Sequence, residues 1–84
     1  MQKSIHTDGH RRLAELLRAM RQEAGLRQVD VADRLGEPQS FVAKYEAGER
    51  RLDLIELNQV CWALETTLTD VVNRWQRGLG DSPN

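Results

Sequence analysis

Cysteine, proline and long apolar stretches are scarce in this chain of 84 residues, which has one cysteine and two prolines. The single cysteine, Cys61, has no partner for an internal disulfide, and this fits a reducing compartment. No run of about 18 apolar residues exists that could cross a membrane. The N-terminal sequence MQKSIHTDGH lacks the apolar core of a signal peptide. We therefore expect a soluble protein of the cytoplasm.

The sequence also lacks the groups of residues that catalysis needs. No Ser/His/Asp, Cys/His or paired-carboxylate set has a supporting neighbourhood, and a domain of this length has little volume for a substrate pocket. His6 and His10 are four residues apart, but no third or fourth metal ligand accompanies them, so we expect solvated surface histidines. Cys61 lies on an apolar stripe without a basic neighbour, as a small buried hydrophobic residue would. We expect no enzyme activity, no cofactor and no metal.

An excess of positive charge is missing as well, because the formal net charge is −1. Contacts to phosphates need Lys and Arg, so any nonspecific affinity for nucleic acid should be modest. The charges are unevenly distributed along the chain. Residues 1–24 carry five basic and three acidic side chains, whereas residues 53–84 carry two basic and five acidic ones.

The sequence does contain a pattern of two short helices joined by a tight turn, in residues 28–47. The apolar stripe of the first helix consists of Val31, Ala32 and Leu35, and that of the second of Val42 and Tyr45. Gly36 sits where the first helix ends, a place that favours a left-handed backbone. Pro38 suits a first helical turn because it has no N–H to leave unpaired. Two helices joined in this way can offer the second one to the major groove of DNA.

Three further helices are predicted by apolar residues that recur every three or four positions. The first begins with a cap at Thr7 or Asp8 and ends near Gly25, the fourth begins with a capping box of Asp53 and Glu56, and the last is capped by Thr67 and Asp70. Their inward stripes are Leu13, Leu16, Leu17 and Met20; Leu57, Val60, Cys61 and Leu64; and Leu68, Val71, Val72 and Trp75. A hydrophobic content of 39% suits one small helical domain. The last stripe is then surplus apolar surface, and association with a second copy would stabilise the domain.

This pattern resembles the helix-turn-helix family of Cro, the lambda-type phage repressors and the Xre regulators, from about Leu13 to Val72. The sequence LLRAMRQEAGLRQ precedes the motif and GERRLDLIELNQVCWAL follows it, as is usual in that family. The resemblance implies an all-α fold, a compact five-helix lambda-repressor-like domain whose second and third helices form the helix-turn-helix. We expect a flexible arm at residues 1–7, the DNA-binding domain at residues 8–77 with a dimerisation helix at about 67–77, and a disordered tail at residues 78–84.

Three residues depart from the family's pattern and leave helix boundaries open. Arg27 stands where the family prefers a capping Ser or Thr, Glu37 where it prefers Val or Ile, and Pro38 where another capping Ser is common. We therefore expect weaker helix starts at these points, while the fold is unaffected.

The third helix, about Gln39 to Ala47, is the expected recognition helix. With Val42 and Tyr45 inward, its outward face consists of Gln39, Ser40, Phe41, Ala43 and Lys44. Glutamine can pair with adenine and lysine with guanine, and an apolar ring can touch a thymine methyl group. We expect Gln39, Ser40, Phe41 and Lys44 to read bases, with a core position as the alternative for Phe41.

The resemblance also implies residues that hold the DNA backbone. It places Gln28 at a helix N-terminus close to the phosphates, with an ordinary surface glutamine as the alternative. Arg27, and the adjacent Arg50 and Arg51 in the loop behind the third helix, are further candidates for phosphate contacts. A paired-charge surface loop would look the same at Arg50 and Arg51.

Two structural roles follow from the same resemblance. Arg21 and Glu46 match an arginine and a glutamate that pair in several family members, so we expect a buried ion pair between them. The family commonly dimerises through its C-terminal end. The expected dimer interface consists of Leu68, Val71, Val72 and Trp75.

We therefore expect a sequence-specific double-stranded DNA-binding protein, a homodimeric transcriptional repressor that occupies an inverted-repeat operator. A phage or mobile-element repressor, a restriction-modification controller and an antitoxin that regulates its own operon all fit. Such a protein is bacterial or phage-encoded and lies in the cytoplasm, on the nucleoid when bound. The alternative is a protein-interaction module of the same fold, favoured by the low net charge and the tryptophans, with a partner such as a toxin or an antirepressor.

Overall fold

The computed structural model describes residues 7–79, and in this part of the chain there are five helices and no strand. In chain order the helices are α1 Asp8–Glu23, α2 Gln28–Leu35, α3 Gln39–Glu46, α4 Leu54–Ala63 and α5 Leu68–Leu79. None of them is long and apolar enough to cross a membrane. The predicted all-α, five-helix fold is confirmed.

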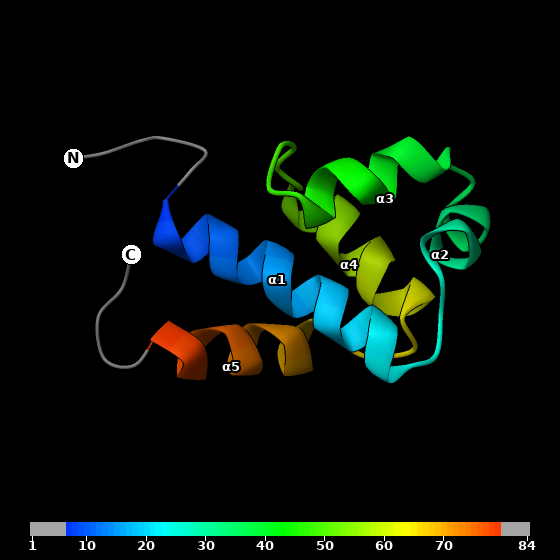
Figure 1. Ribbon diagram of the computed structural model, residues 1–84. Helices are drawn as coiled ribbons and strands as arrows, with labels where there is room; N and C mark the ends of the chain where they lie inside the picture. Colours follow the sequence, from blue (N-terminus) through cyan, green and yellow to red (C-terminus); the bar gives the residue numbers. More distant parts are fainter. Residues whose placement is uncertain (1–6, 80–84) are drawn as a thin grey trace.

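Helix α1 crosses the molecule with α3 on one side and α5 on the other (Figure 1). Helix α4 packs against α2 and α5, and α2 packs against α3 at the end of the molecule farthest from α5 (Figure 1). This arrangement leaves the outer side of α3 uncovered by any other helix.

Of the predicted arm at residues 1–7 only Thr7 is described, and of the predicted tail at residues 78–84 only Gly78 and Leu79 are described. Both belong to α5, so the helix runs two residues beyond its predicted end at about residue 77. A Cβ at Gly78 would meet the guanidinium of Arg12 on α1, the far end of a flexible side chain that can move aside. Gly78 thus lies within α5 and does not end the helix.

Three of the helices have the side-chain caps at their N-termini that the sequence predicts. The hydroxyl of Thr7 accepts from a backbone N–H in the first turn of α1 at 3.2 Å. Asp53 and Glu56 form the capping box of α4, with N–H to carboxylate distances of 2.7 and 3.0 Å. The hydroxyl of Thr67 accepts from the backbone N–H of Asp70 at 3.1 Å. Each contact satisfies an N–H that the helix itself leaves unpaired.

Arg27 precedes α2 as its N-cap and makes no side-chain capping hydrogen bond to the backbone of the first turn, while Asp30 in that turn bonds back to Arg27. The carboxylate of Asp30 accepts from the backbone N–H of Arg27 at 2.7 Å and from its guanidinium at 2.9 and 3.1 Å. These hydrogen bonds lower the pKa of Asp30 to about 2. Helix α2 thus begins without the side-chain cap that the family prefers, as expected, and the bonds between Arg27 and Asp30 hold its first turn. Pro38 precedes α3 as its N-cap, one residue before the first turn in which it was expected.

The core lies where the apolar stripes of all five helices meet. Its members are Leu17, Met20, Val31, Ala32, Val42, Tyr45, Leu57, Val60, Cys61, Ala63, Leu64 and Val71. Cys61 is fully buried, as expected, and burial raises the pKa of its thiol. An inert hydrophobic role for this cysteine follows.

The apolar face of α5 is largely used inside the chain. Val71 is fully buried in the core, so the prediction that it lies at a dimer interface is wrong. Leu68 is half-buried and packs against the same core. Trp75 is half-buried, and its indole N–H donates to the carbonyl of Gly9 on α1 at 2.8 Å. Because these side chains pack α5 against the rest of the domain, little exposed apolar surface is left on α5 for a dimer interface.

Candidate nucleic-acid interface

The helix-turn-helix consists of α2 and α3, whose inner sides close on one core. Val31 and Val42 are fully buried, and Tyr45 is 2% exposed. Gly36 ends α2 with φ of +68°, the left-handed conformation expected at this position. The packed inner side of α3 determines which residues it presents outward.

The outer side of α3 carries the residues predicted to read bases. Gln39, Ser40 and Lys44 are exposed. Phe41 is half-buried, and its ring meets the buried ring of Tyr45 edge to face, with 5.6 Å between the centroids. Phe41 thus combines its two expected positions, because one part of the ring packs on the core and the other stays at the surface.

A buried ion pair joins α1 to the end of α3. Arg21 donates from Nε and Nη2 to the two carboxylate oxygens of Glu46 at 2.7 and 3.1 Å, and from Nη1 to the carbonyl of Leu26 at 2.8 Å. The two side chains are 10% and 3% exposed. The hydrogen bond to Glu46 raises the pKa of Arg21. This is the Arg21–Glu46 pair that the resemblance implied.

The same carboxylate orients the first residue of α2. Gln28 donates from Nε2 to Glu46 Oε1 at 3.0 Å, and Gln39 donates from Nε2 to Gln28 Oε1 at 3.3 Å. A chain of hydrogen bonds therefore runs from the buried ion pair to the N-terminus of α2 and on to the N-terminus of α3. Gln28 is half-buried and held by two partners, unlike a loose surface glutamine. Two helix N-termini, which favour anions, are thereby held side by side.

Two of the arginines predicted to hold phosphates already have carboxylate partners. Arg27 is bonded to Asp30, and Arg50 donates to both oxygens of Glu56 at 2.8 and 3.2 Å. The hydrogen bonds between the two side chains lower the pKa of Glu56 and raise the pKa of Arg50. The spacing of Asp53 and Glu56 predicts only the cap of α4 for Glu56. Its bond to Arg50 had no sequence signal, because residue spacing does not say where side chains point across a loop.

Arg51 lies in a different environment from its neighbour. It lines a hollow of about 250 Å³ together with Thr7, His10 and Trp75, beside the start of α1. The two adjacent arginines thus diverge, with Arg50 turned toward α4 and Arg51 toward α1.

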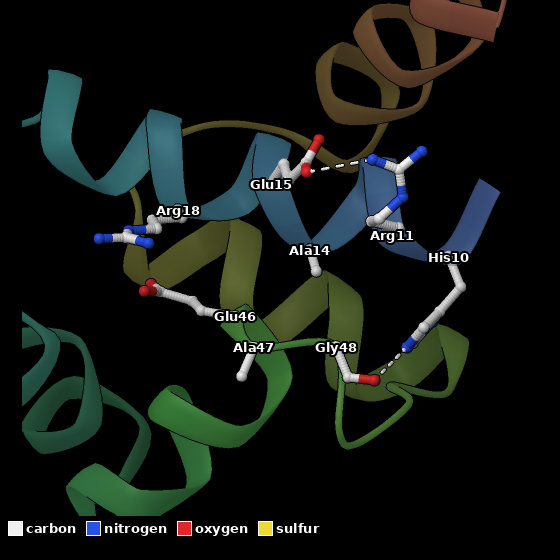
Figure 2. Close-up of a pocket in the computed structure, with 8 residues that line it drawn as sticks. All are labelled: His10, Arg11, Ala14, Glu15, Arg18, Glu46, Ala47 and Gly48. Atoms are coloured by element: carbon white, nitrogen blue, oxygen red, sulfur yellow. Dashed lines mark hydrogen bonds and ion pairs between the residues drawn. The ribbon is translucent and has the colours of Figure 1, made fainter. Parts of the chain in front are cut away.

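A second hollow, of about 320 Å³, lies between α1 and the end of α3 (Figure 2). Figure 2 shows His10 reaching from α1 to the carbonyl of Gly48, with 3.1 Å between Nε2 and the oxygen. With its proton on Nε2, His10 donates to that carbonyl and joins α1 to the turn behind α3. The expectation of a solvated surface histidine is wrong for His10, and His6 lies outside the described residues.

The hollow does not assemble a reactive group. Glu46 at one end is neutralised by Arg21, and Glu15 at the other end pairs with Arg11 at 3.6 Å (Figure 2). Among residues 7–79, no three His, Cys, Asp or Glu side chains are grouped so as to hold a metal ion. The outer side of α3 and the two helix N-termini are therefore the best-organised functional surface of the described chain.

Comparison with known proteins relates the chain to helix-turn-helix proteins. The helix-turn-helix domain family matches residues 12–75, whereas comparison with curated proteins gives no match. Among solved structures, an XRE-family like protein from Pseudomonas syringae pv. tomato str. DC3000 is 38% identical, with a TM-score of 0.80 over 90% of this chain and 92% of that one. The restriction-modification controller protein C.AhdI from Aeromonas hydrophila is 27% identical, with a TM-score of 0.67 over 71% of this chain and 91% of that one.

A third structure shows the same fold at lower identity. It is the restriction-modification controller protein C.Esp1396I, solved as a tetramer with its natural 35 base-pair operator. It is 17% identical, with a TM-score of 0.78 over 83% of this chain and 92% of that one. Because the family match spans most of the chain and the Pseudomonas protein is similar over nearly its whole length, the chain belongs to the XRE-like helix-turn-helix family.

Proposed function

We propose that this protein is a sequence-specific double-stranded DNA-binding transcriptional regulator, a homodimeric repressor that occupies an inverted-repeat operator. The observation that carries the proposal is the division of α3 into two sides. Val42 and Tyr45 are buried, while Gln39, Ser40 and Lys44 stand exposed on the side that no helix covers. Amide, hydroxyl and ammonium groups are the ones that read base edges in the major groove.

The proposed division of labour follows from the surroundings of each side chain. Gln39, Ser40 and Lys44 read bases, and the exposed part of Phe41 meets a thymine methyl group. Gln28 holds a phosphate from the N-terminus of α2, where the amide is already oriented by Glu46. Arg51 is a further phosphate contact.

Arg27 contributes less to binding phosphates in this proposal. Its guanidinium must exchange the carboxylate of Asp30 for a phosphate, so only the difference between the two contacts adds to affinity. Together with the net charge of −1, this leaves base contacts and dimerisation to supply more of the binding free energy.

The proposed homodimer interface is formed mainly by α4, and α5 contributes only at its margin. The exposed large hydrophobic residues of the described chain are Leu54, Ile55 and Trp62, at 67%, 71% and 68% exposure, and all three belong to α4. Ile55 and Trp62 are seven residues apart and share one side of that helix. Exposed apolar side chains gathered on one helix are typical of an association surface, and tryptophan is a common anchor. Leu68 and Val72 of α5 are proposed to flank this contact.

Two of the similar proteins are restriction-modification controllers, and C.Esp1396I forms a tetramer on its operator. This supports association of several copies on DNA as the working form of the present protein. Phage repressor, restriction-modification controller and antitoxin share this mode of action. We propose a bacterial or phage-encoded protein that acts in the cytoplasm, on the nucleoid when bound, without a cofactor and without catalytic activity.

Selection of bound duplexes from a random pool tests the proposal. The wild type should enrich an inverted repeat whose half-sites lie about one helical turn apart, because a two-fold dimer presents two α3 helices in that geometry. Recovery of unselected sequences at physiological salt would contradict it.

A protein-interaction module of the same fold is the second candidate, and the exposed Trp62 favours it. It predicts that no duplex is enriched and that Trp62→Ala abolishes binding to a protein such as a toxin or an antirepressor. The pool selection separates the two candidates, since only the regulator yields a consensus sequence.

A further inference from the structure

The ring of Phe41 is held between a cation and a second aromatic ring. The guanidinium carbon of Arg50 lies 4.6 Å from the centroid of Phe41. On another side, the ring of Tyr45 meets Phe41 at an interplanar angle of 79°. A surface phenylalanine would otherwise exchange between rotamers, so these two contacts restrict where the ring stands.

Arg50 is itself held in place by the far side of the loop. Its Nη2 donates to Glu56 Oε2 at 2.8 Å, and its Nη1 donates to Glu56 Oε1 at 3.2 Å and to the carbonyl of Arg51 at 2.8 Å. Glu56 in turn belongs to the capping box of α4 and is fixed by Asp53. The guanidinium of Arg50 is thus bonded to α4 through Glu56, and its carbon lies over the ring of Phe41 on α3.

This arrangement is poorly suited to binding a phosphate. A phosphate on Arg50 would have to share the guanidinium with the carboxylate of Glu56, which already neutralises its charge and would repel the phosphate. Glu37 and Asp53 add further negative charge around the same guanidinium. The positive charge of Arg50 is therefore already balanced within the chain.

We propose that Arg50 is a positioning residue for base recognition: it fixes the ring of Phe41 at the outer side of α3 and does not hold a phosphate. The base preference at the position that Phe41 touches then depends on Arg50 and Glu56, neither of which reaches the DNA. This inference rests on the proposed DNA-binding function. It replaces the sequence-based expectation that Arg50 and Arg51 play the same role.

The test measures affinity against salt concentration for the selected operator and for operators changed at single base pairs. Arg50→Ala should leave the slope of log affinity against log salt unchanged. It should reduce discrimination about fivefold or more at the same base pair that Phe41→Leu affects. The double variant should discriminate no worse than Phe41→Leu alone. A phosphate contact would instead lower the slope by up to about 2 in a dimer and weaken all sequences alike.

Matched variants remove the remaining ambiguity. Arg51→Ala, the neighbouring proposed phosphate contact, should lower the slope and leave base preference intact. Glu56→Gln keeps a side chain that can complete the capping box but weakens the hold on Arg50, so it should reduce discrimination at the Phe41 position. Glu49→Gln removes an exposed charge nearby and should leave discrimination at the Phe41 position unchanged. If Glu56→Gln leaves discrimination unchanged and steepens the salt slope, Arg50 is a phosphate contact and the proposal is overturned.

A measurement without DNA separates failure of this inference from failure of the proposed function. In the free wild type, the side-chain protons of Arg50 should show upfield ring-current shifts in NMR spectra that disappear in Phe41→Leu. Absence of these shifts overturns the contact itself. Shifts present in a protein that selects no DNA would refute the regulator function and the reading role together, while the contact between Arg50 and Phe41 stands.

Discussion

The side-chain amide of Gln28 donates a hydrogen bond to the carboxylate of Glu46 at 3.0 Å. Glu46 is 3% exposed in its side chain and is also the partner of Arg21, so the residue that opens α2 is anchored to an ion pair in the core. The stability of the domain and the orientation of its proposed DNA-binding surface therefore depend on the same carboxylate.

Glu46→Gln should lower the free energy of unfolding by about 3 kcal/mol, because the substitution leaves the buried charge of Arg21 without a counter-charge. For a chain of this size the melting temperature should fall by about 12 °C or more. Thermal unfolding followed by circular dichroism measures this. Glu23→Gln is the control, since its exposed pair with Arg74 at 3.5 Å should be worth less than about 1 kcal/mol. A melting temperature of Glu46→Gln within about 2 °C of wild type would contradict the prediction.

Gln39→Ala and Lys44→Ala should each reduce the ratio of operator affinity to scrambled-DNA affinity, because base contacts contribute about 1 to 3 kcal/mol to discrimination. Gln28→Ala should weaken binding to both duplexes, because it removes a contact to the backbone, with at most a small change in their ratio from the lost hydrogen bond to Gln39. Titrations of each variant on the two duplexes at one salt concentration measure these ratios. If Gln39→Ala and Lys44→Ala bind with wild-type ratios, α3 does not read the sequence.

Trp62→Ala should weaken self-association by about 30-fold or more, since a central aromatic residue typically contributes about 2 kcal/mol to an interface. Trp75→Phe should leave the dimerisation constant near that of wild type and lower stability, because it loses the hydrogen bond to Gly9 within the chain. Sedimentation equilibrium determines both constants. The reverse ranking would return the interface to α5, and a wild type that stays monomeric at tens of micromolar would refute the dimer.

Asp30→Asn should make the free energy of unfolding depend less on pH in acid solution. The pKa of Asp30 is lowered from 3.8 to about 2 by its hydrogen bonds to Arg27. A carboxylate with a lowered pKa stabilises the fold above about pH 4, and this contribution is lost as the pH falls toward about 2. Over that range the free energy of unfolding should decline more steeply for wild type than for Asp30→Asn. Denaturant unfolding at several pH values, with Asp33→Asn as the control, detects the difference, and equal declines would contradict it.

Sequence alone determined the helices, the turn and the members of the core. Apolar residues spaced by three and four positions can share a side only in a helix, so the stripes of α1 to α4 were predicted, and their residues are buried or, for Leu13, Leu16 and Leu35, partly buried against the core. Gly36 marked the turn because a left-handed backbone is costly for other residues. The Arg21–Glu46 pair came from the family resemblance, since nothing in the spacing of two residues 25 positions apart indicates a contact.

Tertiary structure decided which apolar surface stays uncovered and what surrounds each charge. Helix α4 has apolar residues on two sides, and periodicity does not say which side the other helices cover. Packing buries Leu57 and Val60 and leaves Ile55 and Trp62 in solvent, while Val71 of α5 enters the core. Likewise, composition counted Arg50 and Arg51 as equivalent cations, whereas the fold brings a carboxylate to one and turns the other toward α1. The physical reason is the same in both cases: spacing along a helix determines which side chains share a face, and only contacts between distant segments determine what that face meets.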